Sequence, residues 1–188
     1  MPPKVKTTKE DIIEGALSLV RLGGAGAINA RGIAAALGCS TQPIFSNFSS
    51  MEELEEEVTS AAYRLYLGFI EREITSGRYP DYKASGMAYI RFAAEERELF
   101  KLLFMCDREG KDIAPTADFT AAVDMIMGAN GVSREVATLI HLEMWACVHG
   151  IATMLATSFL SLEWSLISDI LSDVYLGVRE KHLSEGKI

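Results

Sequence analysis

Apolar residues recur at helical spacing along nearly the whole chain, and this periodicity limits the possible folds more than any other feature. No segment shows the alternation of apolar and polar residues that is typical of a β-strand. Beyond residue 80, helices are expected at about 81–94, 96–107, 116–129, 133–158 and 163–182. The sequence therefore predicts an all-α protein of about nine helices.

Two capping boxes are expected to start helices in the first 80 residues. Thr7 and Glu10 have the spacing of such a box, and an apolar stripe follows them until a run of glycines ends the helix. Ser50 and Glu53 have the same spacing and precede a long helix that should end near Gly77.

The segment of about 29–48 predicts a helix-turn-helix. Asn29 can cap a helix over 30–37, which buries apolar side chains and stops at a glycine. Ser40 can cap a third helix, and Pro43 fits its first turn because the missing N–H has no intrahelical partner there. Helix, glycine-containing turn and helix within about 18 residues is the helix-turn-helix pattern.

The third helix of this motif is expected to present polar side chains and to keep Ile44 and Phe48 inside. Gln and Asn can bond an adenine edge with two hydrogen bonds, and a Thr methyl can contact a thymine methyl in the major groove. The polar residues expected on the exposed side are Thr41, Gln42, Ser46 and Asn47.

Charge is distributed unevenly along the chain. The net charge is −8, yet the first 50 residues carry five Lys or Arg and only three Asp or Glu. A mildly basic N-terminal segment on an acidic body is compatible with a nucleic-acid partner for that segment alone. No Lys or Arg lies between Arg31 and Arg64, so few ionic contacts with phosphates are expected.

These features resemble the DNA-binding domain of the TetR family of bacterial transcriptional regulators. The similarity runs from about Thr8 to Val58 and is most specific in the stretch RGIAAALGCSTQPIFSNFSSMEEL. With the side-chain chemistry above, the resemblance implies DNA contacts by Lys6, Lys9, Arg31, Ser40, Thr41, Gln42, Pro43, Phe45, Ser46 and Asn47. Family members commonly carry Tyr at the position of Phe45 and His or Tyr at the position of Asn47. They commonly carry Lys at the position of Met51. Two phosphate contacts are therefore expected to be missing, together with some affinity for DNA.

The remainder of the chain resembles one variety of TetR effector domain, marked by Trp145, His149 and Gly150 in the stretch MWACVHGIATM. The body is rich in Met and aromatic residues, which suit a cavity for a small hydrophobic effector, although for any single residue ordinary core packing is the favoured interpretation. His149 could likewise be a hydrogen-bonded core histidine. The residues predicted to line the effector site are Tyr66, Phe69, Phe104, Trp145 and His149.

Two amphipathic stripes near the C-terminus predict a homodimer, because the resembled family dimerises by pairing such helices as a four-helix bundle. Packing of both stripes within one chain is the alternative. The residues predicted at the dimer interface are Met144, Val148, Ile151, Leu155, Ile167, Leu171 and Val174.

The expected organisation is a DNA-binding domain over 1–50 and a ligand-binding and dimerisation domain over 51–188. The resemblance implies a cytoplasmic dimeric regulator, usually a repressor, that binds a pseudo-palindromic double-stranded operator. The alternative is an all-α protein-interaction or ligand-sensing module whose DNA binding is weakened or lost. No catalytic motif, cofactor, metal site or membrane span is expected, and a metal site formed by His141, Glu143, Cys147 and His149 is disfavoured by helical spacing.

Overall fold

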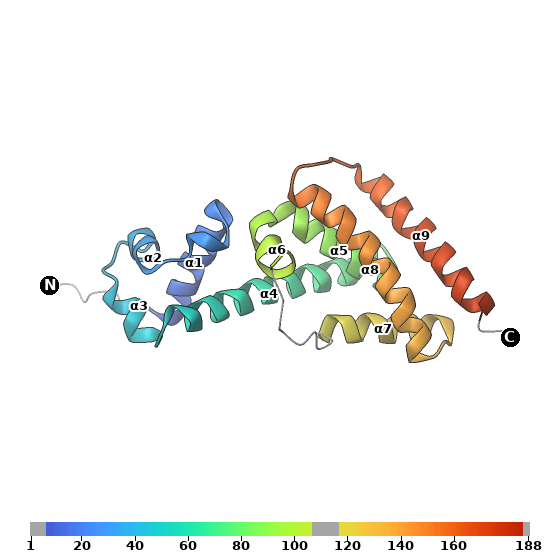
Figure 1. Ribbon diagram of the computed structural model, residues 1–188, viewed down its shortest axis with the longest axis horizontal. Coiled ribbons are helices and arrows are strands. Elements are labelled where there is room, and N and C mark those ends of the chain that lie inside the picture. Colours follow the sequence, from blue (N-terminus) through green and yellow to red (C-terminus); the bar gives the residue numbers. More distant parts are fainter. Residues whose placement is uncertain (1–6, 107–116, 186–188) are drawn as a thin grey trace. The chain divides into compact units, whose positions relative to one another are not determined.

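The computed structural model describes residues 7–106 and 117–185, and it is helical throughout (Figure 1). Within those ranges there are nine α-helices, one short 3-10 helix and no strand. The prediction of an all-α protein is confirmed. Nine helices arise because each apolar stripe ends at a glycine, a proline or a polar turn before the next one begins.

The first of two compact units contains residues 1–67 and 96–106. Its elements are α1 (Lys9–Gly23), the 3-10 helix η1 (Ala25–Ala27), α2 (Ala30–Ala36), α3 (Gln42–Asn47), the start of α4 (Met51–Thr75) and α6 (Arg97–Phe104). Helix α6 packs against α1 although more than 70 residues separate their starts. Arg21 on α1 fixes this pairing by donating two hydrogen bonds to the Glu96 carboxylate, at 2.8 and 2.9 Å.

The second unit contains residues 68–95 and 107–188. Its elements are the end of α4, α5 (Asp81–Glu95), α7 (Ala117–Asn130), α8 (Arg134–Ala156) and α9 (Trp164–Glu185). The boundaries of these two units differ from those of the predicted functional domains, 1–50 and 51–188. The functional domains remain a prediction. Helix α4 starts in the first unit and ends in the second, so one continuous helix belongs to both.

The caps of α1 and α2 show why these helices begin and end where they do. The α1 capping box is formed by Thr8 and Asp11, one residue later than the predicted pair: the Thr8 hydroxyl accepts from Asp11 N, and Thr8 N donates to Asp11. Gly24 ends α1 with φ of +73°, a conformation that L side chains rarely adopt. Asn29 caps α2 as predicted, because its Oδ1 accepts from Gly32 N at 2.7 Å.

The predicted caps of α3 and α4 are only partly correct. Thr41, not Ser40, occupies the N-cap of α3, and it makes no side-chain capping bond. Pro43 lies in the first turn as expected. At α4, the Ser50 hydroxyl accepts from Glu53 N, but the Glu53 carboxylate accepts from the backbone and hydroxyl of Ser49 instead of returning to Ser50.

The core of the first unit joins α1, α2, α3 and α4 around fully buried aliphatic side chains. The predicted inward orientation of Ile44 and Phe48 is confirmed, since they are 0% and 2% exposed. The other side chains at the centre of this core are Ile12, Ala16, Val20, Ile33, Leu54, Val58 and Ala62. Burial of one face thus holds α2 and α3, the helices of the helix-turn-helix, in place. The opposite face of α3 is left free to be polar.

The core of the second unit is built on α8, which packs against α5, α7 and α9. Its apolar stripe is buried against these neighbours, and α5 contributes Met87, Ile90 and Phe92, all 0% exposed. Among the described residues, α8 is the one helix that is long and apolar enough to cross a membrane. Because part of α8 is buried inside the protein, and core helices meet the same two criteria, this is weak support for a membrane span.

Candidate nucleic-acid interface and effector-domain contacts

Helix α3 presents a small outward surface that contains both polar and apolar groups. Gln42, Phe45 and Ser46 are exposed, whereas Thr41 and Asn47 are half-buried. Phe45 is 57% exposed, and it is the one large apolar residue of α2 and α3 that is exposed. This surface is the part of the motif that is free to meet a partner.

Two of the predicted base-reading groups already donate hydrogen bonds within α3. The Ser46 hydroxyl donates to the Gln42 carbonyl at 2.9 Å, and Asn47 Nδ2 donates to the Pro43 carbonyl at 2.7 Å. Back-bonding of this kind uses the donor that a base acceptor would need. Gln42 keeps its side-chain amide without a hydrogen bond to any described residue, so it is the best placed of the predicted readers.

The cations of the first unit are less available than their number suggests. Lys9 Nζ lies 2.8 Å from Glu57 Oε1, 3.8 Å from Glu53 Oε1 and 5.0 Å from the centroid of the Phe48 ring. The hydrogen bond to Glu57 raises the pKa of Lys9. Arg31 is exposed and forms no ion pair with the described residues. Lys6, the other predicted cation, lies outside the described residues.

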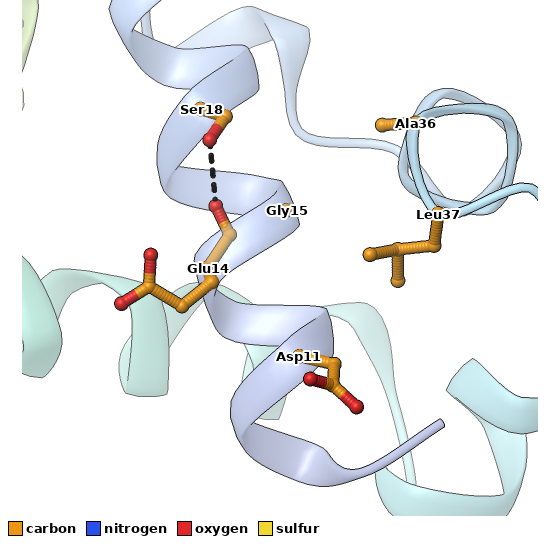
Figure 2. Close-up of a pocket in the computed structure, with 6 residues that line it drawn as sticks. All are labelled: Asp11, Glu14, Gly15, Ser18, Ala36 and Leu37. Atoms are coloured by element: carbon orange, nitrogen blue, oxygen red, sulfur yellow. Dashed lines mark hydrogen bonds between the residues drawn. The ribbon is translucent and has the colours of Figure 1, made fainter. Parts of the chain in front are cut away.

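A pocket of about 320 Å³ lies between α1 and α2 in the same unit (Figure 2). It is lined by Asp11, Glu14, Gly15, Ser18, Ala36 and Leu37. Figure 2 shows the Asp11 and Glu14 carboxylates on α1 and the side chain of Leu37, the C-cap of α2; Ser18 donates to the Glu14 carbonyl at 3.0 Å. Two carboxylates in this pocket would repel a phosphate backbone, so DNA would not be bound here. Helical spacing alone did not identify this pocket.

The residues predicted to line the effector site form three aromatic contacts within the two units. In the first unit Tyr66 is 4% exposed and meets Phe104 edge to face, with ring centroids 5.1 Å apart. In the second unit Phe69 meets Phe92 edge to face at 5.3 Å, and the Arg72 guanidinium lies 4.3 Å from the Phe69 centroid. Core packing and ligand contact are both compatible with such pairs.

The Trp145 and His149 pair forms the third contact. Their ring centroids are 5.4 Å apart, and His149 Nδ1 is 2.8 Å from the Tyr89 hydroxyl. Burial lowers the pKa of His149, so the imidazole is held neutral near pH 7. Trp145 is 44% exposed, which places much of its indole on the surface of α8. Tyr89 was not identified from the sequence because its partner is 60 residues away.

Two further His contacts lie in the second unit. The Tyr82 hydroxyl lies 3.1 Å from His141 Nδ1, and burial lowers the pKa of this His141 imidazole. Glu143 Oε1 lies 2.8 Å from His182 Nε2. Residues 7–106 and 117–185 contain no group of three or more His, Cys, Asp or Glu side chains that could hold a metal ion.

Most of the residues predicted at the dimer interface are buried within the single chain. Six of them are 9% exposed or less: Met144, Val148, Ile151, Leu155, Ile167 and Leu171. Val174 is half-buried. The apolar side chains that the two helices leave exposed are different ones: Leu139, Leu142 and Trp145 on α8, and Trp164, Leu166 and Leu176 on α9.

The comparisons with known proteins agree with this architecture. The model of the tetracyclin repressor-like C-terminal domain matches residues 82–169. Among solved structures, a TetR-like transcriptional regulator from Rhodococcus sp. RHA1 superposes with a TM-score of 0.62, over 97% of this chain and 99% of that one, at 12% sequence identity. No curated protein matches the sequence. The domain match over residues 82–169 and the fold shared with this regulator support a regulator of the TetR family.

Proposed function

We propose that the protein is a cytoplasmic, dimeric, ligand-responsive repressor that binds a pseudo-palindromic DNA operator through α3. A small hydrophobic effector bound in the second unit releases it from the operator. The observation that carries this proposal is the helix-turn-helix itself: Ile44 and Phe48 anchor α3 while Gln42 and Phe45 stay exposed on its outer face. The match to the tetracyclin repressor-like C-terminal domain supports transcription regulation as the process in which this surface acts.

Support for DNA as the partner comes from the chemistry of the exposed groups. An unengaged Gln side chain can make two hydrogen bonds to an adenine edge in the major groove. Arg31, exposed one residue after the start of α2, provides a charge for the phosphate backbone. Two copies related by a two-fold axis would double both contacts and read two half-sites about one helical turn apart.

Support for a dimer comes from the exposed apolar side chains of α8 and α9. Leu139, Leu142 and Trp145 recur along α8 at helical spacing with 43–45% exposure, on a side that the chain itself does not cover. A Cβ added at Gly150 or Gly177 would meet nothing within 4 Å, so both helices also offer open space for close approach of a partner helix. We therefore assign the interface to this outer face.

Support for coupling comes from the continuity of α4. One end of this helix follows the recognition helix after a short turn, and the other end carries Phe69 and Glu73 into the second unit. Glu73 is only 9% exposed and is paired with Arg91 of α5, so the end of α4 is fixed to its neighbour by a largely buried ion pair. An effector acts on the operator only if it binds two arrangements of α4 with different affinities.

A second function is favoured by one observation, the ion pair that occupies Lys9. With that cation paired to Glu57, and without the Tyr and Lys common in the family, the motif has little charge for a phosphate backbone. An all-α ligand-sensing or protein-interaction module with lost DNA binding would have the same composition.

The experiment that separates the two functions uses the full chain and fragments of its own genome in a gel shift. A repressor retains specific fragments at low salt, and adding its effector releases them. A folded protein that retains no fragment supports the interaction module. Sedimentation at micromolar concentration tests the dimer: Leu142→Glu is expected to yield monomers, and the exposed polar change Thr59→Glu on α4 is the control.

A further inference from the structure

Phe45 is a large apolar residue exposed on the outside of a six-residue helix. The two apolar neighbours in α3 and its C-cap, Ile44 and Phe48, already supply its buried anchor at 0% and 2% exposure. Phe45 contributes a ring that is 57% exposed and forms no aromatic pair with a described residue. The fold therefore does not need this side chain, and water solvates it unfavourably in the free protein.

Phe45 and Gln42 are the main side chains of α3 that remain free to contact a partner. The hydroxyl of Ser46 and one amide hydrogen of Asn47 are already donated to α3 carbonyls. Phe45 has no polar atom on its ring, so it cannot bond a phosphate or the polar edge of a base. Any affinity that it contributes must come from contact with an apolar group.

The major groove offers one apolar group, the C5-methyl of thymine. Gln42 and Phe45 are three residues apart in a helix, so their side chains are neighbours on one face with Cβ atoms about 5–6 Å apart. Bases along one strand are spaced by about 3.4 Å, so two such side chains reach adjacent or next-adjacent base pairs.

We propose that Phe45 is a specificity-determining residue that reads a thymine C5-methyl, beside an adenine that Gln42 reads. This inference rests on the proposed function, because it requires α3 to enter the major groove. It predicts half-sites in which A·T pairs are favoured at two neighbouring positions, although the protein places no cation on α3.

The test removes the methyl group and leaves every hydrogen bond in place. A bound site is first selected with the full-length protein from randomised duplexes, and each thymine of that site is then replaced by deoxyuridine. One thymine in each half-site is expected to be sensitive. Losing the burial of one methyl group should weaken binding about fourfold per half-site, and about 15-fold when both half-sites are changed.

A variant cycle assigns the effect to the ring. Phe45→Ala should bind the thymine and deoxyuridine duplexes equally, whereas Phe45→Tyr, which keeps the ring, should keep the difference. Gln42→Ala should lose the adenine preference but keep the methyl effect. Circular dichroism melting confirms that each variant is folded, which is expected because both positions are exposed.

Three outcomes are distinguishable. A methyl effect that disappears only in Phe45→Ala supports the inference. A site that is bound without any sensitive thymine, or a methyl effect that persists in Phe45→Ala, overturns the inference and leaves DNA binding standing. A folded wild-type protein that enriches no duplex contradicts the proposed function itself, and the role of Phe45 with it.

Discussion

Replacing Glu57 by Gln should release Lys9 and make DNA binding more dependent on salt. In the structure the Lys9 ammonium lies 2.8 Å from Glu57 and 3.8 Å from Glu53, a position in which it is already neutralised before any DNA arrives. Both Lys9 and Glu57 are more than one-third exposed, so the pair can be broken by substitution without uncovering the core. The free ammonium would then be available to a phosphate.

The magnitude follows from counting the cations that can neutralise phosphates. With Lys9 paired and Arg21 held by Glu96, the N-terminal segment keeps at most three: Lys4, Lys6 and Arg31. Each neutralised phosphate contributes about −0.9 to the slope of log K against log salt, so a dimer should show a limiting slope of about −5.4. Glu57→Gln leaves Lys9 only its longer contact with Glu53 and should steepen the slope toward about −7.2, the value for one more cation in each subunit.

The assay is fluorescence polarisation of a labelled operator duplex between 50 and 250 mM salt, about the range in which such slopes are measured. Glu56→Gln is the matched control. It removes the same charge at the neighbouring position, and the Glu56 side chain forms no ion pair with the described residues. Both variants should bind more tightly at low salt, and only Glu57→Gln should change the slope. Equal slopes for Glu57→Gln and the wild type would refute the idea that this ion pair withholds Lys9 from DNA.

Three further predictions concern stability, each measured by urea unfolding. Asn29→Ala removes the capping bond of α2 and should cost about 1 kcal/mol, whereas Thr41→Ala, at a cap without a side-chain bond, should cost less than about 0.5 kcal/mol; equal costs would contradict the assignment. Arg91→Met leaves the Glu73 carboxylate buried without its cation and should lower the free energy of unfolding by about 2 kcal/mol. This is less than the ~3–5 kcal/mol of a fully buried pair, because Arg91 is 27% exposed. Adding Glu73→Leu should recover most of the lost stability. Burial lowers the pKa of His141, so the unfolded state binds the proton first and stability should fall as pH drops below about 6.5; His141→Gln should show a smaller fall, and an unchanged pH profile would count against this cause.

Local chemistry explains which parts of the fold could be predicted from the sequence. Asn29 and Gly24 act within one helical turn of their own positions, so their roles as cap and stop follow from residue type. The α1 capping box was displaced by one residue because Thr7 and Thr8 each have an acidic residue three positions later, and spacing cannot choose between them.

Contacts between distant segments explain the rest. The Lys9–Glu57 pair spans 48 residues, and no local pattern brings those two side chains together. The stripe that contains Met144 and Val148 was correctly predicted to be apolar, but periodicity does not tell burial against α5 from burial against a second chain. Which face of α8 stays exposed is decided by the neighbours that cover the other one.

The most direct test of the central claim is selection of duplexes from a randomised pool by the full-length protein, followed by affinity measurement on the enriched sequence. We expect enrichment of a pseudo-palindrome whose half-sites lie about one helical turn apart, and loss of binding in an Arg31→Ala, Gln42→Ala double variant that remains folded. A folded, dimeric wild-type protein that enriches no sequence, or a double variant that binds as tightly as the wild type, would contradict it.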